Sequence, residues 1–188
     1  YLPAICTSTI VGTVFSKIFE TNRGYLNVIL RALHLDFLCQ QWLATPKTAL
    51  ACLLFVNIWQ WTGYSMLMYY TNMLNIPQDL YESATIDGAG SFKQFIYITF
   101  PLLRGTHITL IILDILGALK FFDLSYVLTD GGPAHATETF STYIYTKSFS
   151  TFQQGQASTI VVFMFLIAMV LTVIQLKIYY KKDRKEMN

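Results

Sequence analysis

Four polar and aromatic side chains recur in one apolar segment at the spacing of a helix face. They are Asn57, Gln60, Trp61 and Tyr64. Their offsets of 0, 3, 4 and 7 place them on one side of an α-helix. Aromatic rings stack on the apolar C–H faces of sugars and amides hydrogen-bond sugar hydroxyls, so the pattern predicts contact with a carbohydrate. Tryptophan and tyrosine also gather at membrane interfaces, which is the alternative for this face and the role we expect for Trp59 and Tyr69.

A histidine and an aspartate form a second polar pair, seven residues apart on one predicted helix face. His107 and Asp114 stand in an apolar segment, and ionisable groups at such depth are typical of proton relays. The alternative is a buried Asp114 that hydrogen-bonds to a neighbouring helix, and we favour it. Lys120 and Asp123 are three residues apart and are expected to pair near the outer surface.

The remaining reactive residues form no catalytic or metal-binding pattern. Cys6, Cys39 and Cys52 are odd in number and irregularly spaced, without a CxxC pair, which gives neither a disulfide framework nor a zinc site. The sequence has no nucleophile–base spacing and no phosphate loop of the GxxxxGK[ST] type. We therefore expect no enzyme activity, no metal and no cofactor in this chain.

The composition indicates lipid as the main solvent of the elements that carry these residues. The chain has 188 residues, of which 54% are apolar and 13% charged, whereas an ordinary soluble domain is about 25% charged. The net charge of +2 is too small to indicate nucleic acid. The sequence has no initiator methionine and opens almost directly into an apolar run, so we expect it to be the C-terminal part of a longer chain.

Long apolar segments predict an all-α integral membrane protein, a polytopic helix bundle. A spanning helix needs about 20 mainly apolar residues. The predicted spans are residues 2–19, 48–70, 106–128 and 157–179. Polar groups at this depth seldom face lipid, so Asn57, Gln60, Asp114 and Lys120 favour a bundle with an internal pathway.

Basic residues near the span ends set the predicted orientation. The basic residues of the tail are Lys177, Lys181, Lys182, Arg184 and Lys185. They place the C-terminus in the cytoplasm. Alternation then places residues 129–156 and 20–47 outside and residues 71–105 inside, although the basic residues of the loop 20–47 weaken this bias.

The predicted cytoplasmic loop has the pattern of two short helices joined by a tight turn, over residues 78–100. Pro77 suits the first turn of the first helix, and Gly88 ends it because glycine tolerates a left-handed backbone. Ser91 and Gln94 form a capping-box pattern that starts the second helix. The sequence therefore predicts a rigid helix pair between two membrane spans.

Such a helix pair suits docking onto a partner, because it would expose Glu82 and Asp87 on a fixed surface. The alternative is an interfacial hairpin that only joins two spans. The residues by themselves leave both interpretations open.

This segment resembles the EAA signature of permease subunits in binding-protein-dependent ABC importers. That signature reads E-A-A, three residues, G, nine residues, I-x-L-P. The matching residues are Glu82, Ser83, Ala84, Gly88, Ile98 and Pro101, with both spacings kept. Ser83 and Phe100 replace an alanine and a leucine of the signature. The segments FFDLSYVLTDGGP at 121–133 and TETFSTYIYTKSF at 137–149 are also close to the carbohydrate-type branch, which includes the larger maltose permease subunit.

The resemblance implies that residues 1–188 are the C-terminal part of an ABC importer transmembrane domain in a bacterial-type inner membrane. At least two further spans would precede residue 1. The helix pair would couple to a cytoplasmic ATPase dimer, which binds the ATP and Mg. A second, related permease, an extracytoplasmic solute-binding protein and a sugar complete the implied partners. The implied coupling residues are Glu82, Ser83, Ala84, Asp87, Gly88, Ala89, Ile98 and Pro101.

The resemblance also marks positions in the substrate pathway. Gly117 and Phe121, one helical turn apart, stand where maltose-type subunits place sugar contacts, as do Trp61 and Tyr64. The side chains differ from those of the family, so the position carries over and the chemistry does not.

Two functional classes follow from these patterns. One is the permease subunit of an ATP-driven carbohydrate importer, and the other is a proton-coupled secondary transporter that relays through His107 and Asp114. A secondary transporter needs no ATPase dock, so the complete signature over residues 82–101 favours the importer.

Overall fold

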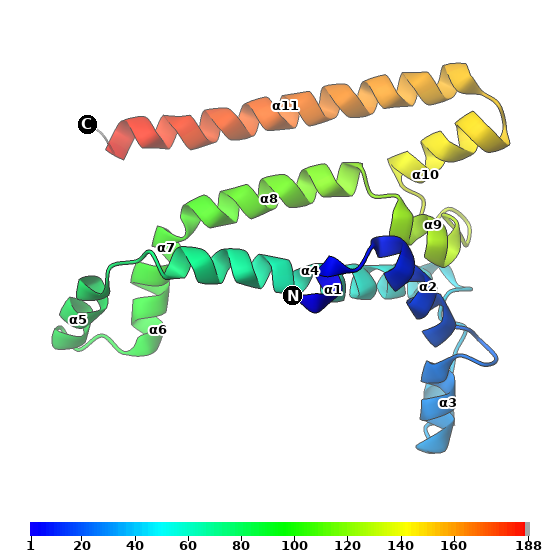
Figure 1. Cartoon of the computed structure of the whole chain (residues 1–188), viewed down its shortest axis with the longest axis horizontal. Helices are drawn as coiled ribbons and strands as arrows, with labels where there is room; N and C mark the ends of the chain where they lie inside the picture. Colours follow the sequence, from blue (N-terminus) through cyan, green and yellow to red (C-terminus); the bar gives the residue numbers. More distant parts are fainter. Residues whose placement is uncertain (187–188) are drawn as a thin grey trace. The chain divides into compact units, whose positions relative to one another are not determined.

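The computed structural model of the chain describes residues 1–186, except for the side chains of residues 176 and 178–186 (Figure 1). The helices are α1 (Leu2–Ile5), α2 (Ser8–Ile18), α3 (Tyr25–Ala32), α4 (Pro46–Met73), α5 (Gln78–Ile86), α6 (Ser91–Gln94), α7 (Phe100–Leu102), α8 (Arg104–Leu119), α9 (Asp123–Thr129), α10 (Phe140–Tyr145) and α11 (Gln154–Glu186). Short turns add η1 (Asp36–Leu38, a 3-10 turn), η2 (Phe95–Thr99) and η3 (Thr146–Ser150), the last two with π-helical geometry. The described residues contain no strand, which confirms the predicted all-α class.

The chain divides into two compact units. One unit comprises Tyr1–Gly63 and Gly117–Ala168, and the other comprises Tyr64–Leu116 and Met169–Asn188. The side chains that dominate the predicted orientation lie outside the described part of the structure, so the cytoplasmic C-terminus stays a prediction. They are Lys181, Lys182, Arg184 and Lys185.

The first unit is held together by close packing of α2 against α9. Gly12 is buried on the contact face of α2, where an added Cβ atom would lie 3.0 Å from Val127. The absence of a side chain at residue 12 therefore sets how closely the two helices approach. The hydrophobic core of this unit consists of Val11, Phe19, Cys52, Leu53, Val56, Leu124 and Leu128.

The predicted span 2–19 is not one continuous helix, because the chain is extended at Cys6 and Thr7 between α1 and α2. The Thr7 hydroxyl accepts the N–H of Ile10 at 3.5 Å, as an N-cap does. The Cys6 carbonyl thereby loses its helical partner and accepts instead the amide N–H of Gln60 at 3.1 Å. A side chain distant in sequence thus supports this break.

The predicted span 106–128 is also divided, between α8 and α9, at residues 120–122. Two hydroxyl groups at the start of α10 donate hydrogen bonds to carbonyls at this break. Thr139 donates to the Phe121 carbonyl at 2.6 Å, and Ser141 donates to the Leu119 carbonyl at 3.4 Å. Lys120 and Asp123 mark this position in the sequence, but the prediction read them as an ion pair near the outer surface and not as the end of a helix.

The other two predicted spans each lie within one helix. α4 has 28 residues and contains the range 48–70, and α11 contains the range 157–179. Within the described residues, Gln154–Gln175 has the length and composition of a membrane span, with a mean hydropathy of 2.7. Ser91–Leu102 and Arg104–Leu119 meet the same test only as a pair bent by 62°. The number of four spans therefore stays a prediction.

Candidate functional site

The predicted cytoplasmic loop folds as a helical hairpin of α5 and α6 in the second unit. Gly88 follows α5 with a φ of 77°, in the left-handed region. Its N–H donates to the Thr85 carbonyl at 3.0 Å, and the Ala89 N–H donates to the Ala84 carbonyl at 2.8 Å. This pair of bonds is the Schellman ending of a helix. The predicted turn at Gly88 is confirmed, and any residue with a side chain would be strained there.

The start of the second helix differs from the prediction. Gly90, not Ser91, is the N-cap of α6, and no side chain caps it. Pro77 likewise precedes α5 as its N-cap residue and is not part of its first turn. The Gln94 amide group turns instead toward α5. Its two hydrogens are shared among the Thr85 hydroxyl (2.9 Å), the Ala89 carbonyl (3.1 Å) and the Tyr81 carbonyl (3.4 Å).

A second polar contact closes the base of the hairpin. The Tyr81 hydroxyl lies 2.8 Å from the Thr99 hydroxyl, which is 4% exposed. Tyr81 and Gln94 therefore clamp the two arms at different heights, and the hairpin can move as one piece. No local sequence pattern reveals this role of Tyr81, since its partner stands 18 residues away.

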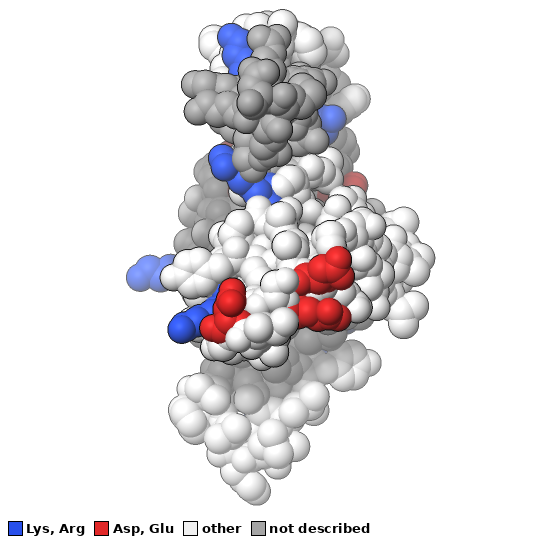
Figure 2. Space-filling model, turned by 90° about the vertical axis from the view of Figure 1, so that its left-hand side faces the viewer, with Lys and Arg blue, Asp and Glu red and all other residues white. Residues whose placement is uncertain are grey.

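The outer surface of the hairpin is acidic and apolar. Figure 2 views this end of the molecule and shows acidic groups among uncharged surface, with a basic group beside one of them. The acidic residues of α5 and its C-cap, Asp79, Glu82 and Asp87, are all exposed. Ile86 is 87% exposed and Phe92 is 76% exposed. Exposed apolar side chains on a rigid base, bordered by carboxylates, suit a protein groove that carries basic groups.

The other predicted coupling residues differ in exposure and in the element that carries them. Ser83 in α5 is exposed, and its hydroxyl donates to the Asp79 carbonyl at 2.8 Å. Ala84 and Ala89 are half-buried at the end of α5 and in the turn after it. Ile98 is half-buried in η2, and Pro101 is exposed in α7, so these two residues follow the hairpin and are not part of it.

A histidine links the hairpin to the long helix that follows it. His107 in α8 has its Nδ1 atom 2.8 Å from the Tyr69 hydroxyl of α4 and its Nε2 atom 3.2 Å from the Phe100 carbonyl of α7. Its ring also lies 4.6 Å from the Phe100 ring and 5.2 Å from the Tyr69 ring, between centroids. These contacts surround the 62° bend between α7 and α8. In the neutral tautomer that donates from Nε2, His107 satisfies both partners.

The predicted relay from His107 to Asp114 is absent from the described residues. Asp114 is exposed, and within the described part of the chain it has neither an ion pair nor a hydrogen bond to a neighbouring helix. Lys120 and Asp123 likewise form no ion pair there. The Tyr69 hydroxyl contacts His107, and its location at the membrane interface stays a prediction.

The predicted pathway residues on α4 share one helix face but differ in exposure. Trp61 is 42% exposed, and Asn57 and Tyr64 are half-buried. Gln60 is 1% exposed, donates to Cys6, and has an Oε1 atom without a hydrogen-bond partner within the described residues. In this structure Gln60 thus supports the break between α1 and α2.

The other two predicted pathway residues, Gly117 near the end of α8 and Phe121 just after it, also differ in exposure. Phe121 is half-buried and packs against the hydrophobic core of the first unit. Gly117 is exposed, and a Cβ atom added to it would meet no atom within 4 Å. Gly117 therefore leaves room for a ligand, whereas Phe121 supports the fold.

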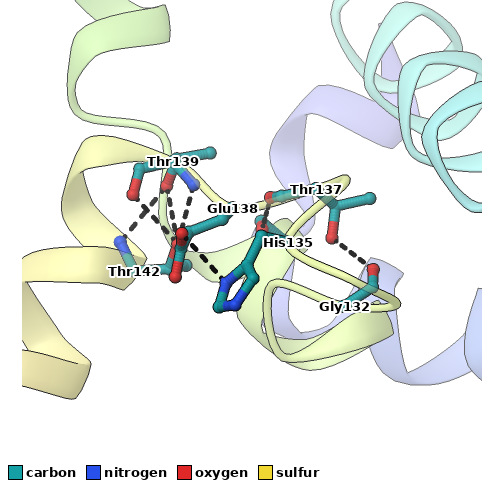
Figure 3. A network of polar contacts seen from close by, with 7 residues as sticks. Gly132, His135, Thr137, Glu138, Thr139 and Thr142 are labelled. Carbon is teal, nitrogen blue, oxygen red and sulfur yellow. Dashed lines mark hydrogen bonds and ion pairs between the residues drawn. The ribbon is translucent and has the colours of Figure 1, made fainter. Parts of the chain in front are cut away.

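The loop between α9 and α10, predicted to lie outside, is a network of hydroxyl groups (Figure 3). The Thr137 hydroxyl donates to the Gly132 carbonyl at 2.8 Å and lies 2.6 Å from the Thr129 hydroxyl. Ser125 donates to the Thr137 carbonyl at 2.5 Å. Ser125 and Thr137 are at most 2% exposed, so this network is part of the interior of the loop.

The end of the loop is fixed by a capping box. Thr139 and Thr142 exchange side-chain and main-chain hydrogen bonds at the start of α10. On the loop surface, His135 Nδ1 lies 3.1 Å from a carboxylate oxygen of Glu138, and Figure 3 shows the imidazole turned toward that carboxylate. The described residues contain no group of three or more side chains that could bind a metal ion.

Comparisons with known proteins agree with this architecture. The sequence model of a family described as "Binding-protein-dependent transport system inner membrane component" matches residues 2–184. The probable ABC transporter permease protein YurN of Bacillus subtilis is 34% identical over 186 residues, 99% of this chain and 63% of that protein. The sulfoquinovosyl glycerol transport system permease protein SmoG of Agrobacterium fabrum is 32% identical over 182 residues, 97% of this chain and 58% of that protein.

A solved structure shares the fold. A chain in the crystal structure of a bacterial alginate ABC transporter, in complex with an alginate pentasaccharide-bound periplasmic protein, is 25% identical and has a TM-score of 0.83. The match covers 93% of this chain and 60% of that chain. The present chain thus spans about three fifths of the length of these relatives.

Proposed function

The chain belongs to the family of binding-protein-dependent transport system inner membrane components, and from this premise we propose that it is a permease subunit of an ATP-driven sugar or oligosaccharide importer. The family match bears out the resemblance stated from the EAA signature. The two relatives whose names or complexes include a ligand handle a sugar glycoside and an alginate oligosaccharide. Carbohydrate is therefore the class of cargo that we propose.

The α5–α6 hairpin is the observation that carries this proposal. It combines the signature residues, a rigid turn at Gly88 and two internal clamps with an exposed acidic and apolar surface. An element of this kind transmits a movement, whereas a loose loop would absorb it. We propose that it docks onto a cytoplasmic ATPase subunit, which binds ATP and Mg and hydrolyses the ATP.

The bend at His107 is the route by which that movement reaches the membrane helices. When the ATPase dimer closes, the hairpin would tilt, and the contacts of His107 with Tyr69 and Phe100 would pass the tilt to α4 and α8. A second, related permease would form the other half of the pathway. An extracytoplasmic binding protein would deliver the cargo, and the multi-pass topology would leave the C-terminus in the cytoplasm.

The cargo pathway that we propose uses Asn57, Trp61 and Tyr64 with Gly117. We leave Gln60 and Phe121 out of this surface, since Gln60 is buried and Phe121 packs against the core. Binding there should be weak, because a transported solute must also leave. Selectivity would rest mainly with the binding protein.

Uptake by the purified complex tests the proposal. The complete complex of permeases, ATPase and binding protein is reconstituted in sealed vesicles, and labelled sugar uptake is followed with ATP held constant. We expect uptake to require ATP and to continue when a protonophore collapses the proton gradient. The Asp114→Asn variant should keep measurable uptake. Uptake that needs the proton gradient and ignores ATP would contradict the proposal.

The pathway has a separate chemical test. In a background in which Cys6, Cys39 and Cys52 are replaced, Tyr64→Cys should react with a water-soluble thiol reagent, and transported sugar should slow the reaction. Met66→Cys, at an exposed position on the opposite side of α4, is the matched control and should show no protection by sugar. If the residue-64 thiol stays unreactive with ATP, without ATP and with binding protein, this face of α4 serves only for packing.

A further inference from the structure

The short helix α3 in the first unit presents apolar side chains on its exposed side as well as toward the core. Leu26 packs against the hydrophobic core, and the buried Asn27 is 2% exposed. On the exposed side, Tyr25 is 66%, Val28 49% and Ile29 55% exposed, followed by Leu33 at 62%. The offsets of 0, 3, 4 and 8 place these four side chains on one face. An apolar face of this kind needs an apolar neighbour.

The orientation of this face is fixed by the side chain on the opposite side of the helix. The Asn27 amide nitrogen donates to the carbonyls of Thr21 and Gln40, both at 3.0 Å. The Trp42 indole N–H donates to Asn27 Oδ1 at 2.8 Å. Both hydrogens and the oxygen of the amide are used, so α3 cannot rotate about its axis without loss of these bonds. The exposed apolar face is therefore a built feature of the loop.

The position of α3 along α4 places it at the level of lipid headgroups. α4 has 28 residues, about 42 Å of helix at 1.5 Å per residue, and the hydrocarbon core of a bilayer is about 30 Å thick. As the predicted membrane span, α4 would have its ends in the headgroup layer. The anchor Trp42 stands four residues before Pro46, where α4 begins, and its carbonyl accepts the Cys52 thiol at 3.9 Å. Figure 1 shows α3 running across the direction of α4, as a helix in the plane of the membrane surface does.

The charges around α3 complement phosphate. Residues 21–35 contain Arg23 and Arg31 and no acidic residue, and both arginines are exposed. Arg31 follows Val28 by three residues, at the edge of the apolar face. Arginine there can lay its stem along apolar surface while its guanidinium reaches phosphate groups. A lipid surface offers both halves of this pattern, an apolar layer beside a layer of phosphates.

We propose that α3 is an interfacial helix, whose face of Tyr25, Val28, Ile29 and Leu33 lies in the boundary between headgroups and acyl chains at the start of α4. The guanidinium of Arg31 contacts lipid phosphate, and Asn27 locks the helix in register with the membrane plane. This anchoring follows from the inner-membrane setting of the family and does not depend on the cargo or on ATP coupling.

Spin-label accessibility in a bilayer tests this anchoring. The intact complex, with its native cysteines replaced, carries a nitroxide label on Ile29→Cys or Val28→Cys and is reconstituted in phospholipid nanodiscs. Asn22→Cys, in the exposed turn before α3, is the matched control. Oxygen concentrates in lipid and a nickel chelate stays in water. We expect the labels at 28 and 29 to collide several-fold more with oxygen than with the chelate, and the label at 22 to show the reverse.

The other results of this experiment overturn the proposal. Equal access of the chelate to residues 22 and 29 would mean that the α3 face is in water. Exclusion of both probes, or protection at residues 28 and 29 when binding protein is added, would mean that a protein covers the face. Collision rates report on the lipid contact whether or not the reconstituted complex transports sugar, so failure of the proposed function is distinguishable from failure of this inference.

Discussion

The α5–α6 hairpin and the loop between α9 and α10 both carry polar groups between the elements that they connect, yet they are built in opposite ways. The hairpin directs its most apolar side chains outward, with Ile86 at 87% and Phe92 at 76% exposed. The loop buries Thr137 against Ser125 of α9, and both residues are at most 2% exposed. The hairpin therefore keeps an exposed apolar surface that a partner could cover, whereas the buried hydroxyl groups of the loop are hydrogen-bonded within the same unit.

This difference separates an element that works through a partner from one that closes the chain. Polar contacts in the hairpin, from Gln94 and Tyr81, keep its two arms together and leave its surface available. Polar contacts in the loop bind main-chain carbonyls, including the Phe121 carbonyl at the break after α8. Changes in the hairpin should therefore affect coupling, and changes in the loop should affect stability.

The largest effect is expected for Gly88→Val in the hairpin. A β-branched residue at a φ of 77° is severely strained, and a left-handed backbone costs about 1–2 kcal/mol for an ordinary residue. We expect ATP-driven uptake to fall by about tenfold or more and the ATPase to co-purify poorly, since 1.4 kcal/mol corresponds to about tenfold.

Gly90→Val is the matched control for Gly88→Val. A Cβ atom at either position would meet no atom within 4 Å, but Gly90 has a φ of −68°. The control should retain near-normal uptake and ATPase association. Equal losses in both variants would show that bulk on the hairpin surface matters and the turn at Gly88 does not.

The next effect is expected for Thr137→Val in the loop. The substitution keeps the side-chain shape and removes a buried hydroxyl, leaving the Gly132 carbonyl without its donor. Such a loss costs about 1–3 kcal/mol. We expect the solubilised complex to inactivate at a lower temperature, while uptake per ATP hydrolysed at low temperature stays normal. Thr159→Val, whose hydroxyl bonds only within its own exposed helical turn, should leave the inactivation temperature unchanged. If Thr137→Val instead lowers the sugar uptake per ATP hydrolysed and leaves the inactivation temperature unchanged, the loop serves coupling and not stability.

The sequence predicted the hairpin better than it predicted the helix breaks, and the range of the deciding interactions explains why. The turn at Gly88 depends on one residue and its neighbours, so a local pattern was enough. Gln94 fitted a capping box locally, but its contact with Thr85 of the other helix decided its role. The break before Thr7 depends on Gln60, 54 residues away from Cys6. Thr7 caps α2 locally through Ile10, but no local pattern reveals the contact from Gln60.

The candidate site shows the same limit. Spacing on one face correctly grouped the polar residues of α4, but it could not show that Gln60 is buried against Cys6 while Trp61 is exposed. His107 stood out as a polar residue in an apolar run. Its partners Tyr69 and Phe100 became evident only when the bend between α7 and α8 was known.

An intermediate effect is expected for His107→Leu at the bend. The variant removes the bonds to Tyr69 and Phe100 while it keeps an apolar side chain beside their rings. A net loss of about 1 kcal/mol should lower the sugar transported per ATP by about threefold to fivefold. Tyr69→Phe, which removes one of the two bonds, should have a smaller effect, and the double variant should be no worse than His107→Leu. Additive losses would show that the two residues act separately and that the bend is not a coupling point.

The smallest effect on stability and uptake is expected for substitutions of two glycines near opposite ends of α8. One glycine lies toward the hairpin and the other toward the break supported by the loop, so the two regions can be compared within one helix. Gly105 follows the bend that joins α8 to the hairpin, and Gly117 precedes the break that the loop supports. A Cβ atom at either residue would meet nothing within 4 Å. Alanine in place of glycine inside a helix stabilises by roughly 0.5–1 kcal/mol, so Gly105→Ala and Gly117→Ala should both raise the inactivation temperature slightly.

If sugar approaches the backbone of α8 at Gly117, the new methyl group should lower uptake by about twofold in that variant alone, with the ATP hydrolysis rate unchanged. Normal uptake in both variants would remove Gly117 from the proposed pathway, because a position that accepts a methyl group without effect on the cargo is not one that the cargo touches.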